Sequence, residues 1–211
     1  MKKKKQFKKK KQKKSFFFNW IIPFFFATLI IYMAVQSLTS GYQNLVMREK
    51  TQNVLEEKEA FIEEIGLISQ QMQEKYDVRA SISIAQAILE SEWGKSDLTV
   101  LYNNLYGVKS SDPSHSALMK TTEYVNGEAI TVQASFKVYD SFYSSIEDHA
   151  QLMTEGTSWD HTLYHPVIQA STYQEAAKAL QTAGYATDPD YHEKLIELIE
   201  QYELDQYDQS S

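Results

Sequence analysis

The chain has 211 residues, a net charge of −7 and no cysteine. Ten of its 21 basic residues are lysines within residues 1–14, so the remaining residues carry 11 basic and 28 acidic groups. This acidic body argues against nucleic acid as the partner, because phosphate binding needs clustered Lys and Arg. Without disulfides, an exported fold has to rest on its hydrophobic core, which a domain of about 150 residues can form.

An almost wholly apolar run follows the lysines, from Phe16 to Val35, and it contains no charged residue. About 20 such residues are needed to cross a bilayer as a helix, and positive charge before the first span keeps that end in the cytoplasm. The sequence therefore predicts a cytoplasmic tail at 1–14, a single-pass transmembrane signal-anchor at 15–36 in the cell membrane, and an extracellular body. A cleaved signal peptide is the alternative, but the run ends without a clean small-x-small cleavage site.

After the anchor, residues 37–57 are predicted to form a stalk, which is polar and turn-prone as far as Asn44 and then a charged helix. Beyond the stalk, apolar residues recur at helical spacing and predict one buried face. They are Phe61, Ile62, Ile65, Ile68, Met72 and Tyr76. A second helix is expected at 81–92, stopped by Gly94, and a loop at 101–109.

A β-hairpin is predicted within 121–139, where polar and apolar residues alternate on either side of Asn126-Gly127. An Asn-Gly pair between such runs is a strong turn signal. Helices return after the hairpin. One is marked by apolar residues from Phe142 to Met153, and the next opens with Thr172 and Glu175 as a capping box.

The last helix is expected to begin with Asp188 as its N-cap and Pro189 as its first helical residue. A polar tail at 205–211 is expected to fray. Residues 58–204 are thus predicted to form one mostly helical α+β domain with a single β-hairpin lobe.

The predicted helix at 81–92 ends in a chemically informative strip. Gln86, Glu90 and Trp93 lie three or four residues apart, so they share one face of a helix. A carboxyl group against an indole loses hydration, which disfavours its charged form and keeps a proton available near neutral pH. Such a group can act as the general acid of glycoside cleavage. An ordinary buried helix that ends in a solvated glutamate is the alternative.

Other chemistries lack the residues they need. The five histidines are scattered with no H-E-x-x-H pattern, so no metal and no cofactor are expected. No G-x-S-x-G motif is present, and a thiol nucleophile is impossible without cysteine. Carboxylate chemistry remains, in a chain whose 14 tyrosines and 3 tryptophans offer aromatic faces that can stack on sugars.

Four segments of the chain form an ordered set of motifs: AQAILESEWGKS (85–96), NNLYGVK (103–109), FKVYDSF (136–142) and GYATDPDY (184–191). In the same order, they resemble motifs of the endo-β-N-acetylglucosaminidases of glycoside hydrolase family 73. These enzymes are bacterial cell-wall autolysins and flagellar rod-cap hydrolases. The match covers about residues 58–204. It implies a lysozyme-like α+β fold with a groove between a helical lobe and the hairpin lobe.

The resemblance also implies roles for single residues. The general acid of the family falls on Glu90, its second proposed carboxylate on Glu123, and its active-site tyrosine on Tyr185. Glu92 stands where the family usually has a small residue. Two positions along a helix turn about 200°, so Glu92 is expected to face solvent. Substrate-binding residues are expected at Trp93, Asn103, Asn104, Tyr106, Tyr124 and Tyr191.

The implied activity is cleavage of the GlcNAc-β-1,4-MurNAc bond in the glycan strands of peptidoglycan. Glu90 would protonate the leaving oxygen, while Glu123 activates water, acts as nucleophile or stabilises positive charge. In a further route the substrate's own N-acetyl oxygen is the nucleophile, oriented by Tyr185. Muramidase or lytic transglycosylase action at the other linkage is one alternative, and a non-catalytic wall-binding module is another. The sequence indicates no protein partner.

Overall fold

The computed structural model describes residues 18–125 and 128–209, with side chains for 26–121 and 130–209. The chain divides between Leu55 and Glu56 into two compact units. The first helix, α1 (Phe18–Tyr76), is continuous across this division. The prediction of a turn-prone stretch before Asn44 is therefore wrong. That stretch holds no proline, and a single glycine is tolerated within a helix.

The predicted transmembrane segment at 15–36 is not confirmed. Residues 15–17 lie outside the described residues, as do the side chains of 18–25. Within the part of the chain that the structure describes, no helix combines the length and the apolarity needed to cross a membrane. The predicted divisions of the chain likewise stay predictions.

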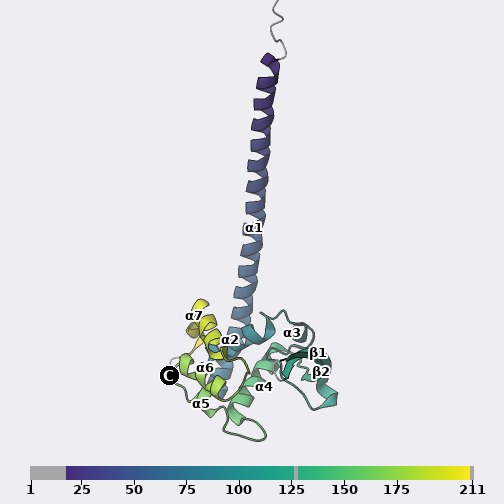
Figure 1. Ribbon diagram of the computed structural model, residues 1–211. Coiled ribbons are helices and arrows are strands. Elements are labelled where there is room, and N and C mark those ends of the chain that lie inside the picture. The colour runs from purple at the N-terminus through teal and green to yellow at the C-terminus, as the bar shows by residue number, and fades with distance from the viewer. Residues whose placement is uncertain (1–17, 126–127, 210–211) are drawn as a thin grey trace, which may run out of the picture. The chain divides into compact units, whose positions relative to one another are not determined.

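The second unit is mostly helical, with one two-stranded antiparallel sheet, which confirms the predicted α+β class. Figure 1 shows its helices gathered around α2 with the hairpin to one side. Besides α1, its helices are α2 (Ala80–Ser91), α3 (Asp97–Tyr102), α4 (Phe142–Glu155), α5 (His165–Ile168), α6 (Tyr173–Thr182) and α7 (Tyr191–Gln201), with short 3₁₀ turns η1 (Pro113–His115) and η2 (Leu204–Tyr207).

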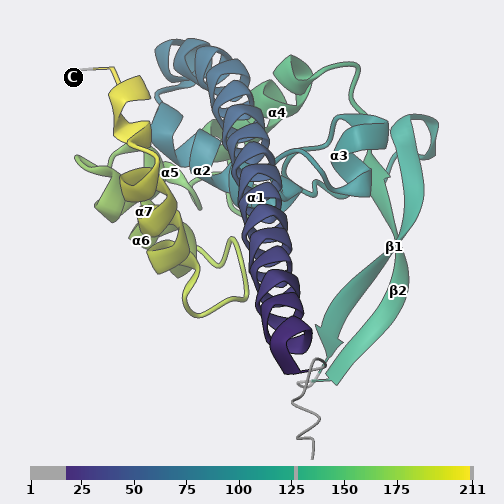
Figure 2. The same ribbon diagram turned by 90° about the horizontal axis from the view of Figure 1, so that it is seen from above.

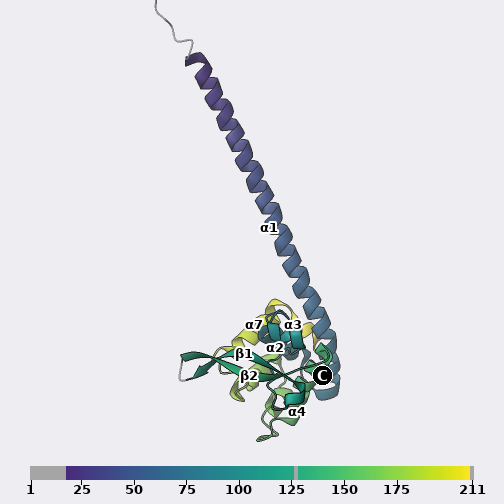
Figure 3. The same cartoon turned by 90° about the vertical axis from the view of Figure 1, so that its right-hand side faces the viewer.

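The predicted hairpin consists of β1 (Ser116–Val125) and β2 (Glu128–Lys137). It begins five residues earlier than the alternation indicates, and the predicted turn at 126–127 lies outside the described residues. Val125 pairs with Glu128 at one end and Ser116 with Lys137 at the other. In Figure 2 this hairpin ribbon lies on the opposite side of the unit from α6 and α7. Figure 3 shows the ribbon extending away from the helices.

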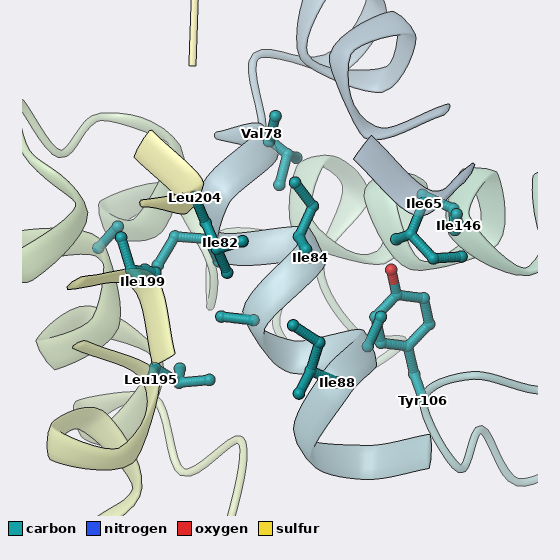
Figure 4. Packing of buried hydrophobic residues seen from close by; sticks show 14 of the residues in the cluster. Ile65, Val78, Ile82, Ile84, Ile88, Tyr106, Ile146, Leu195, Ile199 and Leu204 are labelled. Carbon is teal, nitrogen blue, oxygen red and sulfur yellow. The ribbon is translucent and has the colours of Figure 1, made fainter. Parts of the chain in front are cut away.

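The core forms around α2. Ten of the twelve residues of this helix are buried, as expected for a helix that is apolar almost all round. Figure 4 shows Leu195, Ile199 and Leu204 on one side of α2, and Ile65, Ile146 and Tyr106 on the other. Because other segments enclose α2 on both sides, its C-terminal end, which carries Glu90, is held in a fixed place.

The C-terminal region differs from its prediction in two ways. The helix α7 begins at Tyr191, because the carboxylate of Asp188 accepts from Asp190 N–H and Lys194 Nζ instead of capping a helix from Pro189. The tail does not fray between 205 and 209. Asp208 instead accepts from Ser81 N–H at 2.8 Å and from Ser81 Oγ at 2.9 Å. Before α6, Thr172 accepts from Glu175 N–H as the predicted capping box requires, while the Glu175 carboxylate accepts from Ser171 N–H, one residue before the N-cap.

Candidate active site

Glu90 lies on the last turn of α2, where the helix ends abruptly. Glu92 and Trp93 have left-handed backbones (φ 53° and 63°), and the N–H of Gly94 donates to Ser91 Oγ at 2.7 Å. Glu90 keeps contact with solvent, yet the protein atoms around it displace enough water to raise the pKa of its carboxyl group. A hydrogen bond from Tyr191 acts in the opposite direction but does not cancel this effect. Glu90 therefore holds its proton to a higher pH than an ordinary glutamate.

A chain of two hydrogen bonds reaches Glu90 from the protein interior. Tyr191, the first residue of α7, is 2% exposed, and its hydroxyl donates to Glu90 Oε1 at 2.8 Å. Gln86 Nε2 donates to the same hydroxyl at 3.1 Å. Gln86 and Glu90 are one turn apart on α2, so both reach Tyr191 from the same helix face. The sequence predicts that Gln86 and Glu90 share a face. It does not predict their contact with Tyr191, which lies 101 residues after Glu90 in the chain.

An aromatic cluster lies next to this chain of bonds. The ring of Tyr185 stacks on that of Tyr191, with centroids 5.8 Å apart, and meets the rings of His149 and Tyr164 at 6.0 Å each. Tyr185 precedes α7 and follows Gly184 (φ 73°). Burial and the nearby Glu90 raise the pKa of Tyr185 well above its usual value. Tyr185 thus stays a neutral hydroxyl in the electrostatic range of Glu90.

His149, like Tyr164, is a member of the cluster that the sequence did not single out. It is fully buried on α4 and stacks on Tyr106, with ring centroids 3.9 Å apart. Burial lowers the pKa of His149 to about 3, and neither ring nitrogen has a hydrogen-bond partner among the described residues. Its position on the apolar face of the predicted helix at 142–153 was the only available signal.

Two predicted substrate-binding residues are buried and hold a loop in place. Tyr106 is 5% exposed, and its hydroxyl donates to the carbonyl of Ser83. Asn104 is 1% exposed, donates to the carbonyls of Val108 and Lys137, and accepts from Val108 N–H. These two side chains are thus buried in this structure, and their contact with substrate stays a prediction. The neighbouring Asn103 donates to the carbonyl of Tyr139.

Trp93 does not continue the helix that carries Gln86 and Glu90. Because α2 ends at Ser91, the helical spacing no longer applies at position 93. The indole packs edge-on against Phe61 and Tyr202, with centroids 6.3 Å and 4.8 Å away, and Lys58 Nζ lies 4.2 Å from its ring centroid. Glu92 is exposed, as expected.

The second predicted carboxylate, Glu123, lies on β1 opposite Ile130. Its side chain and that of Tyr124 are outside the described residues. Nearer the base of the hairpin, Ala117 pairs with Phe136, which is buried. The base of the ribbon is fixed to α4, where Asp148 accepts from Lys137 Nζ and from Tyr139 OH.

No group of three or more His, Asp or Glu side chains in the described part of the chain is arranged to hold a metal ion. The residues gathered around Glu90 are neutral phenols, an amide and a neutral imidazole. Such a set can hold and release one proton at Glu90, and can offer hydroxyl groups to a polar substrate.

Comparison with known proteins places these residues within one family. The family model described as mannosyl-glycoprotein endo-beta-N-acetylglucosaminidase matches residues 67–204. The exo-glucosaminidase LytG of Bacillus subtilis is 44% identical over 184 residues, which cover 87% of this chain and 65% of that protein. A probable N-acetylmuramidase of Lactococcus lactis is 36% identical over 181 residues, covering 83% of this chain and 41% of that protein.

A solved structure supports the same grouping. The catalytic domain of the autolysin Auto from Listeria monocytogenes has a TM-score of 0.67 and 39% identity, covering 72% of this chain and 88% of that domain. This likeness supports the lysozyme-like fold expected for the mostly helical unit and its hairpin. The chain spans less than two thirds of the length of the two curated relatives above.

Proposed function

The chain belongs to the glucosaminidase family of glycoside hydrolases, and on this basis we propose that it cleaves the GlcNAc-β-1,4-MurNAc bond of peptidoglycan with Glu90 as general acid. The observation that carries the proposal is the environment of the Glu90 carboxyl group. It is open to solvent, its pKa is raised, and it is hydrogen-bonded through Oε1 to a buried tyrosine. A general acid has to hold its proton until it reacts and has to be accessible to the leaving oxygen, and the raised pKa and the solvent exposure of Glu90 both favour this role.

In the proposed reaction, Glu90 transfers its proton to the glycosidic oxygen as the C1–O bond breaks through an oxocarbenium-like state. Two routes then lead to the product. Glu123 activates water or stabilises the positive charge, or the substrate's N-acetyl oxygen attacks C1 while Tyr185 orients the acetamido group. The family's second proposed carboxylate, which falls on Glu123, favours the first route, and the electrostatic influence of Glu90 on Tyr185 favours the second.

A second candidate function is cleavage of the other β-1,4 linkage. It is favoured by the likeness to a protein named a probable N-acetylmuramidase. The name of LytG, an exo-glucosaminidase, raises the further question of whether cleavage begins at a chain end.

One digestion distinguishes these functions. Purified peptidoglycan is treated with the full chain, the new reducing ends are reduced with borohydride, and the fragments are identified by mass spectrometry. The proposal predicts reduced GlcNAc at the new ends. Reduced MurNAc would indicate muramidase action, anhydro-MurNAc a lytic transglycosylase, and intact glycan a non-catalytic module. Release of single residues or disaccharides before any shortening of long strands would indicate exo-cleavage.

We also propose that the chain is anchored in the cell membrane with its body outside. The support is in the sequence alone, in the lysine block at 1–14 and the uncharged apolar run that follows it. The intact protein should sediment with membranes, and protease added to whole cells should remove its body. Recovery from the medium of a mature form beginning near Ser37 would instead indicate cleavage of a signal peptide.

A further inference from the structure

Gln86 is a fully buried glutamine whose amide is hydrogen-bonded on one side only. Its Nε2 donates to Tyr191 OH at 3.1 Å, and its Oε1 has no hydrogen-bond partner among the described residues. A buried polar atom without a partner costs stability. An apolar residue of similar size would avoid that cost. The presence of an amide at this position therefore indicates that the amide has a role.

The amide determines which way the hydroxyl of Tyr191 points. A tyrosine hydroxyl has one hydrogen to donate and can also accept. Because its oxygen accepts from Gln86 Nε2, its hydrogen is free for Glu90 Oε1, 2.8 Å away. The reversed amide would turn the tyrosine towards Gln86 and bury an NH₂ group without acceptors. Buried N–H groups without partners are rarer in proteins than under-satisfied carbonyls, which favours the observed orientation.

We propose that Gln86 is a positioning residue, which acts through Tyr191 to keep the transferable proton of Glu90 on Oε2. The inference deepens the proposed function and depends on Glu90 being the general acid. With Oε1 occupied as an acceptor, the neutral carboxyl group carries its hydrogen on the other oxygen. Oε2 is then the atom that gives its proton to the glycosidic oxygen, while the electron pair of the C1–O bond passes to that leaving oxygen.

The same bond assists the reaction once it has begun. As the proton leaves Oε2, negative charge spreads over both carboxylate oxygens, and the hydrogen bond from Tyr191 to Oε1 becomes charge-assisted and stronger. An interaction that strengthens only in the transition state raises kcat and leaves substrate binding unchanged. Gln86 contributes because a hydroxyl that accepts a hydrogen bond becomes a better donor.

Few other titrating groups disturb this arrangement near neutral pH. Tyr185 interacts with both Glu90 and Tyr191, and is itself influenced by Tyr106, Tyr164 and Tyr139. The pKa values of all these tyrosines are raised, chiefly by burial, so they stay protonated. His149, 6.0 Å from Tyr185, stays neutral because its pKa is lowered to about 3. The alkaline limb of the pH–rate profile therefore reports the loss of the proton from Glu90.

The test compares Gln86→Met, Tyr191→Phe and the double variant in the full chain, with the exposed Gln169→Met as control. Methionine keeps the length of glutamine but cannot donate. We expect Gln86→Met to lower kcat about tenfold with KM within twofold, and to move the alkaline limb to higher pH. Tyr191→Phe should move the limb further, by about one pH unit, because a lost hydrogen bond to a carboxylate disfavours its ionised form. In the Tyr191→Phe background, Gln86→Met should cost nothing more.

A second measurement does not depend on catalysis. The ¹³C shift of the Glu90 carboxyl carbon, followed against pH by NMR, should show a higher pKa in both single variants than in the unmodified chain. If the unmodified chain proves inactive on glycan, the proposed function fails while this titration still tests the inference. An equal loss from Gln86→Met with and without Tyr191 would overturn the inference, as would an unchanged Glu90 titration in folded Gln86→Met.

Discussion

The indole of Trp93 packs between the start of the catalytic unit and its end. Its neighbours are Phe61 and Lys58 on α1 and Tyr202 after α7. Lys58 Nζ also donates to Tyr202 OH at 2.8 Å. A partly buried tryptophan with these contacts stabilises the packing of two segments that are far apart in sequence. Glu90 is held separately, by the hydrogen bond from Tyr191.

Trp93→Ala should therefore reduce stability more than catalysis. We expect the free energy of unfolding to fall by about 2–4 kcal/mol, somewhat less than for a large aromatic in a fully buried core, because Trp93 is partly exposed. The kcat of the folded fraction should stay within about twofold. Urea unfolding and kinetics measure the two effects, with the 81% exposed Trp159→Ala as control. A large loss of kcat with unchanged stability would instead support the predicted role of Trp93 in substrate binding.

Glu123 gives a second prediction for a single residue. If Glu123 is the base or the electrostatic stabiliser, Glu123→Gln should lower kcat with little change in KM, because its contribution arises only in the transition state. Glu128→Gln, at the first residue of β2, is the control and should have little effect. Retention of anomeric configuration in the first product, read by NMR, together with a comparable loss in Tyr185→Phe, would instead favour the acetamido route.

The residues of the site differ in how far the sequence can predict them. Gln86 and Glu90 share a helix face, and their four-residue spacing is enough to predict it. The place of Trp93 could not be predicted in this way, because two non-glycine residues, Glu92 and Trp93, adopt left-handed backbones and end the helix early. The bond from Tyr191 to Glu90 depends on how α7 packs against α2, and no local pattern records it.

Among the elements, the segment after α7 has a larger structural role than its polar composition indicates. Asp208 accepts from the backbone N–H and the hydroxyl of Ser81 in the first turn of α2, and Arg79 Nη1 lies 3.4 Å from its carboxylate. A carboxylate at this end of a helix satisfies an otherwise unpaired N–H and interacts favourably with the helix dipole. The C-terminal segment thus fixes the helix that carries Glu90.

Asp208→Ala should lower the free energy of unfolding by about 1–3 kcal/mol, since it leaves partly buried donors without an acceptor. Asp205→Ala, an exposed position in the same segment, is the matched control. Thermal or urea unfolding of the full chain measures the difference. Equal stabilities for the two variants would show that the contact at the start of α2 contributes nothing.

Elements with strong local signals were predictable, and elements defined by distant partners were not. The alternation around Asn126-Gly127 predicts the hairpin, and the Thr172–Glu175 pair predicts the start of α6. The start of α7 was misplaced because the carboxylate of Asp188 also has Lys194 as a partner, one turn into that helix. The order in 205–209 was missed because its main partner, Ser81, is 127 residues away.

At the scale of the whole molecule, His149 links stability to pH. Its pKa is about 3 in the fold, against an ordinary value of 6.5. Between these values the unfolded chain binds a proton that the folded chain does not, so stability is lost as the pH falls below 6.5. The loss is about 1.4 kcal/mol per pH unit, or roughly 2 kcal/mol by pH 5.

His149→Phe keeps a ring against Tyr106 but cannot take up a proton. When the pH is lowered from 6.5 to 5, the free energy of unfolding should therefore fall in both proteins by amounts that differ. The fall should be about 2 kcal/mol smaller for His149→Phe than for the unmodified chain. Urea unfolding at the two pH values measures this difference, and the exposed His161→Phe should behave like the unmodified chain. Parallel pH dependence in all three proteins would mean that His149 is protonated in the fold.

The central claim, that Glu90 supplies the proton for glycan cleavage, is tested most directly by comparing Glu90→Gln with Glu92→Gln on purified peptidoglycan. Glutamine keeps the size and most of the hydrogen bonding of Glu90 but has no transferable proton. The account predicts that Glu90→Gln, with an unchanged melting temperature, loses at least about 10²-fold in kcat, the usual share of general acid catalysis, while Glu92→Gln stays near normal. A folded Glu90→Gln protein with near-normal turnover would contradict the account.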